Sequence, residues 1–190
     1  MNNEEILVLM ERLGVLRYGH FLLTSGRHSD RFLLSSQLTM YPNQTQALIG
    51  LLAHKVLQAG LHPTVVIGPA MGGIILAYEM ARTLGCQGMY AEKDGEGMAL
   101  KRGFTLNATD TVLIVEDAVS TGGSVQKVID ALQIHAAEIL GVAVLFDRSH
   151  GQVTFAGRPP IALLNLDIQS WSPEECPLCQ AGIPLVAPKL

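Results

Sequence analysis

Residues 111–124 read Thr111-Val-Leu-Ile-Val-Glu-Asp-Ala-Val-Ser-Thr-Gly-Gly-Ser124. The apolar run from Val112 to Val115 is short and unbroken, which predicts a strand buried on both faces, as in a parallel sheet. Two acids, Glu116 and Asp117, stand at its carboxyl end, and a small hydroxyl-rich turn follows. A helical pattern then begins, and its apolar face holds Val125, Val128, Ile129 and Leu132. A strand, a turn and a helix in this order are typical of α/β folds.

The turn at residues 120–124 has the composition of an anion site, with two glycines and three hydroxyl side chains. The first N–H groups of a helix have no partner within it, and the helix dipole places partial positive charge there. The preceding acids suit O–H donors or a hard cation, so we expect a sugar phosphate with its ribose hydroxyls on Glu116 and Asp117. The alternative is an ordinary loop whose acids are solvated and whose glycines only turn the chain.

A second strand–turn–helix unit precedes this one. Val65 to Ile67 predicts a short buried strand, Gly68-Pro-Ala-Met-Gly-Gly73 is a glycine-rich turn, and a helix follows to about Leu84. In open α/β sheets, ligands bind outside the carboxyl ends of the strands, so both turns are expected at one edge. A diphosphate could bridge them; tight helix–strand packing at the glycines is the alternative.

Further elements are predicted on either side. The expected helices cover residues 2–13 and 42–60, and the expected strands are a weak one at 87–91, then 139–146 and 161–166. Arg148 follows the strand at 139–146, where it could pair with an acid or fork onto a substrate carboxylate.

Two polar segments allow more than one interpretation. Residues 21–34 could form a surface hairpin around Gly26 or a lid over the site. Residues 92–102 predict a flexible loop that is either solvated or closes over substrate, where its cations could meet a diphosphate. Those cations are Lys93, Lys101 and Arg102.

Composition narrows the class of protein. With 190 residues, 48% of them hydrophobic, we expect one globular domain. The net charge of −4 without a basic run argues against nucleic acid as a partner. We expect no membrane association and a cytoplasmic location, because no apolar stretch reaches membrane-span length and the polar, acidic N-terminus is unlike a signal peptide.

Three cysteines do not suggest a disulfide framework. Cys176 and Cys179 form a single C-x-x-C pair, whereas a structural zinc needs four ligands. Cys86 and the scattered histidines offer no second pair at zinc-finger spacing, although a dimer could bring two tails together. We therefore expect no metal ligands among the side chains.

Several stretches together resemble the orotate phosphoribosyltransferases, which are type I phosphoribosyltransferases. The segment 116–124 is similar to their signature for phosphoribosyl diphosphate (PRPP): a hydrophobic strand, two acids, small residues and T-G-G-S. The other similar segments are Thr24-Ser-Gly-Arg-His-Ser-Asp30, Gly68–Gly73, Phe146-Asp-Arg148 and the closing Ile183-Pro-Leu-Val186.

The resemblance implies the type I phosphoribosyltransferase fold, with a small hood from about 15–40 and the C-terminal segment. It implies transfer of ribose 5-phosphate from PRPP to orotate in pyrimidine (UMP) biosynthesis, with Mg²⁺ and commonly as a homodimer. It assigns catalytic roles to Asp117 and Lys93, and orotate contacts to Ser120 and Arg148. The PRPP-binding residues that it implies are Glu116, Asp117, Ala118, Val119, Ser120, Thr121, Gly122, Gly123 and Ser124.

This chain departs from the family pattern at three places. Many members carry a Lys where this chain has Thr24, and Tyr-Lys where it has Met71-Gly72. Its loop keeps only Lys93 before Gly95-Glu-Gly97 and has no His there. Two alternatives therefore stay open: a purine-salvage phosphoribosyltransferase, and a non-enzymatic PRPP-sensing regulator on the same fold.

Overall fold

The computed structural model describes residues 1–23 and 25–188, so Thr24 of the expected N-terminal turn lies outside it. The chain forms two compact units, one from Met1–Met40 with Asp167–Leu190 and one from Tyr41–Leu166. Residues 15–40 and the C-terminal segment, which we expected to form a hood, thus share a unit, together with the first helix. No helix among the described residues has both the length and the apolar character needed to cross a membrane.

The larger unit is built on a six-stranded sheet in the order β5-β4-β3-β6-β7-β8. Four neighbouring pairs are parallel and only β4 and β5 are antiparallel, which confirms the predicted α/β class with a mostly parallel sheet. The strands are β3 (Val65–Pro69), β4 (Gln87–Asp94), β5 (Gly97–Leu100), β6 (Thr111–Val119), β7 (Glu138–Asp147) and β8 (Ile161–Asn165).

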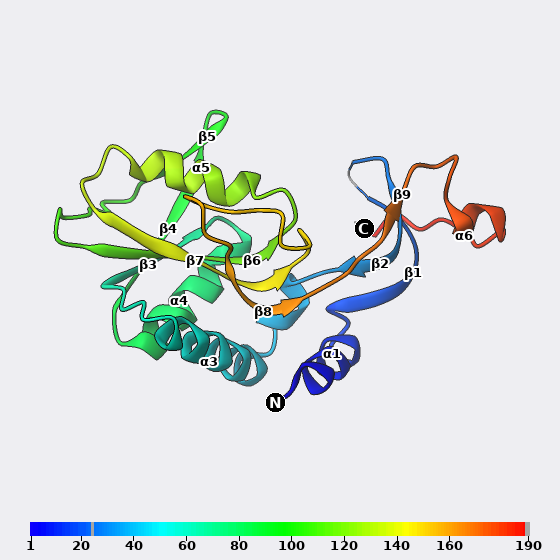
Figure 1. The fold of residues 1–190 in the computed structure, drawn as a ribbon, viewed down its shortest axis with the longest axis horizontal. Helices are drawn as coiled ribbons and strands as arrows, with labels where there is room; N and C mark the ends of the chain where they lie inside the picture. Colours follow the sequence, from blue (N-terminus) through cyan, green and yellow to red (C-terminus); the bar gives the residue numbers. More distant parts are fainter. Residues whose placement is uncertain (24, 189–190) are drawn as a thin grey trace. The chain divides into compact units, whose positions relative to one another are not determined.

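Helices cover both faces of this sheet (Figure 1): α3 (Pro42–Gln58) and α4 (Gly72–Leu84) lie on one face, and α5 (Gly123–Leu132) on the other. Side chains alternate along a strand, so β3 and β6 supply apolar groups to both layers. On the α5 side, one cluster includes Ile67, Ile114, Val125 and Val128, all almost fully buried. Because both faces of the central strands are covered by helices, their sequences are continuous apolar runs, and these runs are the pattern from which the strands were predicted.

The smaller unit has a three-stranded antiparallel sheet in the order β1-β2-β9. Asn2 and Glu5 form a capping box at the start of its first helix, and Gly26 turns the chain between β1 and β2 with a φ of 78°. Residues 21–34 are thus part of a hairpin, as one of the two interpretations predicted. The elements are α1 (Asn3–Arg12), β1 (Leu16–Leu22), β2 (His28–Leu33), α2 (Ser36–Thr39), β9 (Ser170–Trp171) and α6 (Pro177–Gln180).

The structure corrects two details of the prediction. Residues 92–102 are not simply a loop, because β4 continues to Asp94 and pairs with β5 around Gly95. β6 does not end at Val115 but runs through the two acids to Val119, since Ala118 and Val119 still pair with Phe146 and Asp147 of β7.

Candidate functional site

The carboxyl end of β6 carries the two predicted acids, and burial sets their chemistry. Glu116 is only 8% exposed, and its Oε1 accepts the Asp117 backbone N–H at 2.9 Å. Desolvation, together with the nearby charge of Asp117, raises the pKa of Glu116 to about 8. At neutral pH this position therefore holds a protonated carboxyl, which can both donate and accept a hydrogen bond.

The phosphate loop follows directly, where residues 118–125 line a hollow of about 70 Å³. Gln126 donates the first hydrogen bond of α5, to Gly122 O at 2.9 Å, so the N–H groups of residues 123–125 lie before it. Gly122 has a φ of 78°, and a Cβ there would lie 2.8 Å from Val153 Cγ1. Only glycine fits this position without strain, and the bend that it allows directs the helix N-terminus at the hollow.

The second glycine-rich turn lies against the same acids, as predicted. A Cβ on Gly72 would come within 3.2 Å of Asp117 Oδ2 and 3.5 Å of Glu116 Oε1. The peptide bond between Ala70 and Met71 in this turn is cis. The carboxyl ends of β3 and β6 therefore bring the two turns together at one edge of the sheet.

Arg148 lies beside the phosphate loop. Its backbone N–H donates to Val119 O at 2.7 Å, which places it next to Ser120 at the ends of the paired strands β6 and β7. Burial lowers the pKa of its guanidinium, and the charge of Asp117 acts in the opposite direction. Its Nε is buried and has no hydrogen-bond partner among the described residues. A desolvated cation with an unused donor suits a planar anion such as a carboxylate.

The β4–β5 hairpin carries the three cations that were candidates for a diphosphate site. Lys101 Nζ lies 3.2 Å from Asp94 Oδ1, and Arg102 Nε lies 2.5 Å from Glu92 Oε1. Lys93 is exposed on β4. The hairpin thus pairs two of its three cations with its own acids.

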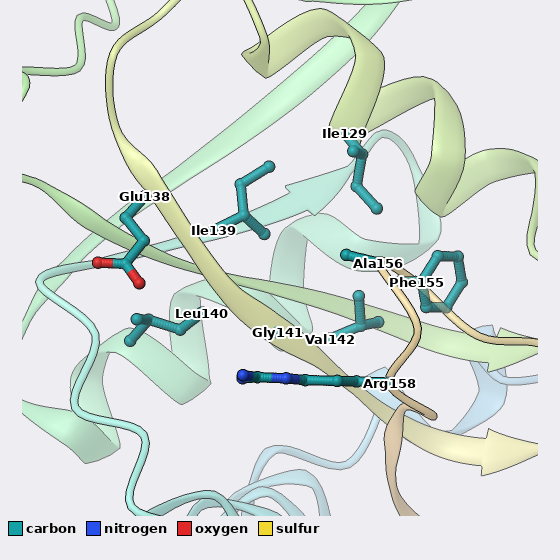
Figure 2. Close-up of a pocket in the computed structure, with 9 residues that line it drawn as sticks. All are labelled: Ile129, Glu138, Ile139, Leu140, Gly141, Val142, Phe155, Ala156 and Arg158. Carbon is teal, nitrogen blue, oxygen red and sulfur yellow. The ribbon is translucent and has the colours of Figure 1, made fainter.

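A larger pocket of about 280 Å³ lies elsewhere in this unit. Figure 2 shows Arg158 extended along it, with Glu138 of β7 and Ile129 of α5 among the lining residues. The β7 residues that line it, 138–142, form the amino-terminal half of the strand, whereas Asp147 ends the strand and Arg148 follows it. None of the predicted site residues lines this pocket, so its size does not identify the functional site.

In the smaller unit, the structure brings together four side chains that the sequence analysis did not connect. His20 and His28 lie beside Cys176 and Cys179, with all four possible ligand atoms within 4.8 Å of one another. The histidines stand on opposite arms of the β1–β2 hairpin, near its turn. In the sequence, the available signal was the position of the two histidines on either side of the hairpin turn. That position does not show that the C-terminal segment with the two cysteines reaches them.

Comparisons with known proteins point to one family. Residues 35–154 match the family described as the phosphoribosyl transferase domain. The orotate phosphoribosyltransferase of Caldanaerobacter subterraneus subsp. tengcongensis is 45% identical, with 99% of this chain and 97% of the relative covered. That of Desulforamulus reducens is 42% identical over the same shares of both chains.

A solved structure shows the same fold. The crystal structure of orotate phosphoribosyltransferase from Aeropyrum pernix matches with a TM-score of 0.74 and 23% sequence identity. The match covers 85% of this chain and 93% of that one.

Proposed function

Because the chain belongs to the orotate phosphoribosyltransferases of the phosphoribosyltransferase family, we propose that it transfers the 5-phosphoribosyl group of PRPP to orotate. The products are orotidine 5′-phosphate and diphosphate, in the route to UMP. One observation carries the proposal: a phosphate loop, two acids and a desolvated arginine meet at one sheet edge.

The PRPP subsite is residues 116–124. The N–H groups at the start of α5 and the hydroxyls of residues 120–124 hold the 5-phosphate. Glu116 and Asp117 hold the ribose hydroxyls. Glu116 is protonated in the free protein, and the O–H donors of the ribose, with Mg²⁺ nearby, favour its ionised form on binding, in which both carboxylate oxygens accept hydrogen bonds.

The base subsite is formed by Ser120 and Arg148. Orotate carries a carboxylate, and a guanidinium can meet it with two parallel N–H bonds. The half-buried guanidinium of Arg148 has already lost part of its hydration, so less desolvation remains when the anion arrives. A neutral purine would offer no such anion, which favours orotate over the purine-salvage alternative.

In the reaction, N1 of orotate attacks C1 of the ribose, while the bond from C1 to the diphosphate oxygen breaks, diphosphate leaves with the electron pair, and the N1 proton passes to the departing diphosphate or to water. Positive charge develops on the ribose, and the Asp117 carboxylate stabilises it electrostatically. The ammonium group of Lys93 stabilises the negative charge of the departing diphosphate. The protein's main contribution is the alignment of the two reactants.

Carboxylate oxygens beside a phosphate loop are hard ligands, so the site fits Mg²⁺. When bound, Mg²⁺ would neutralise charge on the diphosphate, held mostly by substrate and water oxygens, with Glu116 and Asp117 nearby.

We also propose that the enzyme is a cytoplasmic homodimer. None of Cys86, Cys176 and Cys179 is in a disulfide, which supports a reducing compartment. Light scattering on the purified protein at several concentrations tests the dimer, and a monomer at assay concentration would contradict it.

The decisive experiment measures PRPP consumption with orotate, uracil, hypoxanthine and adenine in parallel. We expect turnover with orotate alone. Turnover with a purine would establish the salvage activity instead. PRPP binding without turnover for any base would establish the regulatory alternative.

A further inference from the structure

The strongest unassigned feature is the side-chain cluster in the smaller unit. His20, His28 and Cys176 are buried, with exposures of 2%, 5% and 0%, and Cys179 stands at the surface beside them. Buried imidazoles and thiols that converge on one point are the donor set of structural zinc sites.

Four of the six distances between the ligand atoms have the lengths of edges of a coordination tetrahedron, and all six are within 4.8 Å. With Zn–N near 2.0 Å and Zn–S near 2.3 Å, tetrahedral edges are about 3.3 Å between nitrogens and about 3.6 Å between nitrogen and sulfur. His20 Nε2 lies 3.1 Å from His28 Nδ1 and 3.4 Å from Cys176 Sγ. Cys179 Sγ lies 3.7 Å from His20 Nε2 and 3.3 Å from His28 Nδ1. All four values fall within about 0.3 Å of the ideal edges.

The surroundings of His20 orient its ring as a ligand. Its Nδ1 lies 2.7 Å from the carbonyl oxygen of Ile183, so Nδ1 carries the proton and donates it there. Nε2 therefore directs its lone pair at the cluster. Metal-ligating histidines typically donate their other ring N–H to a carbonyl or carboxylate in this way.

A β-bulge explains why His20 points inward. The β1–β2 register shifts between Tyr18 and Phe21, and the neighbours His20 and Phe21 are both buried. In a regular strand they would point to opposite faces. Bulges commonly redirect a side chain next to a functional site.

The tail forms a compact turn around the two sulfurs. Cys176 O accepts the Gln180 N–H at 3.2 Å, and Cys179 O accepts the Gly182 N–H at 3.0 Å, where Gly182 has a φ of 68°. Beyond this turn, the Val186 N–H donates to His20 O at 2.8 Å, which holds the tail along β1. Short pieces of chain held by few backbone bonds are the setting in which a metal contributes to folding.

We propose that His20, His28, Cys176 and Cys179 bind one structural zinc ion per chain. All four positions of a tetrahedron are taken by side chains, so the site is closed and leaves no position for a substrate. The ion links the N-terminal hairpin to a tail more than 150 residues away. This site is independent of the phosphoribosyl transfer proposed for the larger unit. It supplies the second ligand pair that was missing when Cys176 and Cys179 were judged by sequence spacing alone.

Metal analysis of the full-length wild-type protein, purified under reducing conditions, is the first test. We expect one equivalent of zinc per chain. After chelation and reduction, titration with Co²⁺ should give the intense visible bands of a tetrahedral thiolate site, and Zn²⁺ should bleach them. Removal of zinc should also lower the melting temperature by several degrees. Absence of both metal uptake and the cobalt spectrum, or a Cys176–Cys179 disulfide under reducing conditions, overturns the proposal.

Variants identify the ligands. Cys176→Ser and His28→Ala should lose at least 90% of the bound zinc, whereas His28→Cys should keep most of it, because zinc accepts thiolate as readily as imidazole. Cys86→Ser is the matched control, since Cys86 lies in the other unit, and it should keep the full equivalent. If His28→Ala retains zinc, or if Cys86→Ser loses it, the assigned ligand set is wrong. Because the wild-type titration needs no variant, a misfolded mutant cannot obscure the answer.

Discussion

The burial of Glu116 predicts that replacing this site residue stabilises the free enzyme. Its pKa is raised from 4.5 to about 8 in the folded protein, chiefly by desolvation. Between these two values the folded state binds more protons than the unfolded state, so this group lowers the free energy of unfolding as pH rises. Below pH 4.5 the carboxyl is neutral in both states, and its effect disappears.

The size of the effect follows from the shift. The difference between 4.5 and about 8 is about 3.5 pKa units, which at about 1.4 kcal/mol each corresponds to roughly 5 kcal/mol above pH 8. Local relaxation and water entry reduce such penalties, so we expect about 2 kcal/mol. Glu116→Gln keeps a neutral acceptor for the Asp117 N–H, which now bonds Glu116 Oε1 at 2.9 Å. The variant should therefore gain about 2 kcal/mol at pH 8.5 but clearly less at pH 5.5.

Urea unfolding of both proteins at pH 5.5, 7.0 and 8.5 measures this difference. Glu138→Gln is the control, because Glu138 is exposed at the other end of the sheet, on β7, so its replacement removes no buried carboxyl and should leave the free energy of unfolding nearly unchanged. A variant that is less stable than wild type, or equally shifted at all three pH values, would show that Glu116 is charged and well solvated in the folded protein. The same variant should bind PRPP more weakly, most severely when combined with Asp117→Asn.

Three further predictions concern the same edge of the sheet. Binding of PRPP with Mg²⁺ at pH 7 should release protons from Glu116, seen in calorimetry as an enthalpy that depends on the buffer; no buffer dependence would contradict the raised pKa. Gly122→Ala should cost about 1–3 kcal/mol of stability and weaken PRPP binding, because φ there is 78° and the new Cβ meets Val153. Gly123→Ala, whose Cβ meets only Thr121 Oγ1 at 3.8 Å, should cost far less stability, and equal losses would contradict this account. Arg148→Ala should lower kcat/KM for orotate by the equivalent of about 2–4 kcal/mol at nearly unchanged PRPP affinity, with only partial rescue by Arg148→Lys; parallel loss of PRPP binding would show a structural role instead.

Local sequence patterns were sufficient to predict the central elements of the larger unit. The apolar run at 112–115 and the small residues at 120–124 predicted β6, the turn and α5, because burial and turn chemistry act over a few neighbours. The extension of β6 through Glu116 and Asp117 was missed, since acids do not favour a buried strand by themselves. It depends on pairing with β7, which a local pattern does not show.

The hairpin at 92–102 was missed for a different reason. Its polar composition suggested a loop, although Asp94-Gly95 is a hairpin signal in its own right. The metal cluster was beyond local inference, because it joins two strands and a tail that are distant in sequence. A β-bulge also interrupts the alternation of buried and exposed side chains at His20, and the sequence does not indicate this bulge.

The two groups at the candidate active site share one physical property. Burial disfavours the charge on both Glu116 and Arg148, so neither is at its most stable in the free protein. Strand pairing keeps them there, since the Arg148 N–H bonds Val119 O and Glu116 pairs with Val144. A ribose hydroxyl or a cation beside Glu116 replaces the solvation that its carboxylate lost on burial. A substrate carboxylate does the same for the guanidinium of Arg148. The rigid sheet thus holds groups whose best partners are the substrates, which is why stability and function are expected to oppose each other at Glu116.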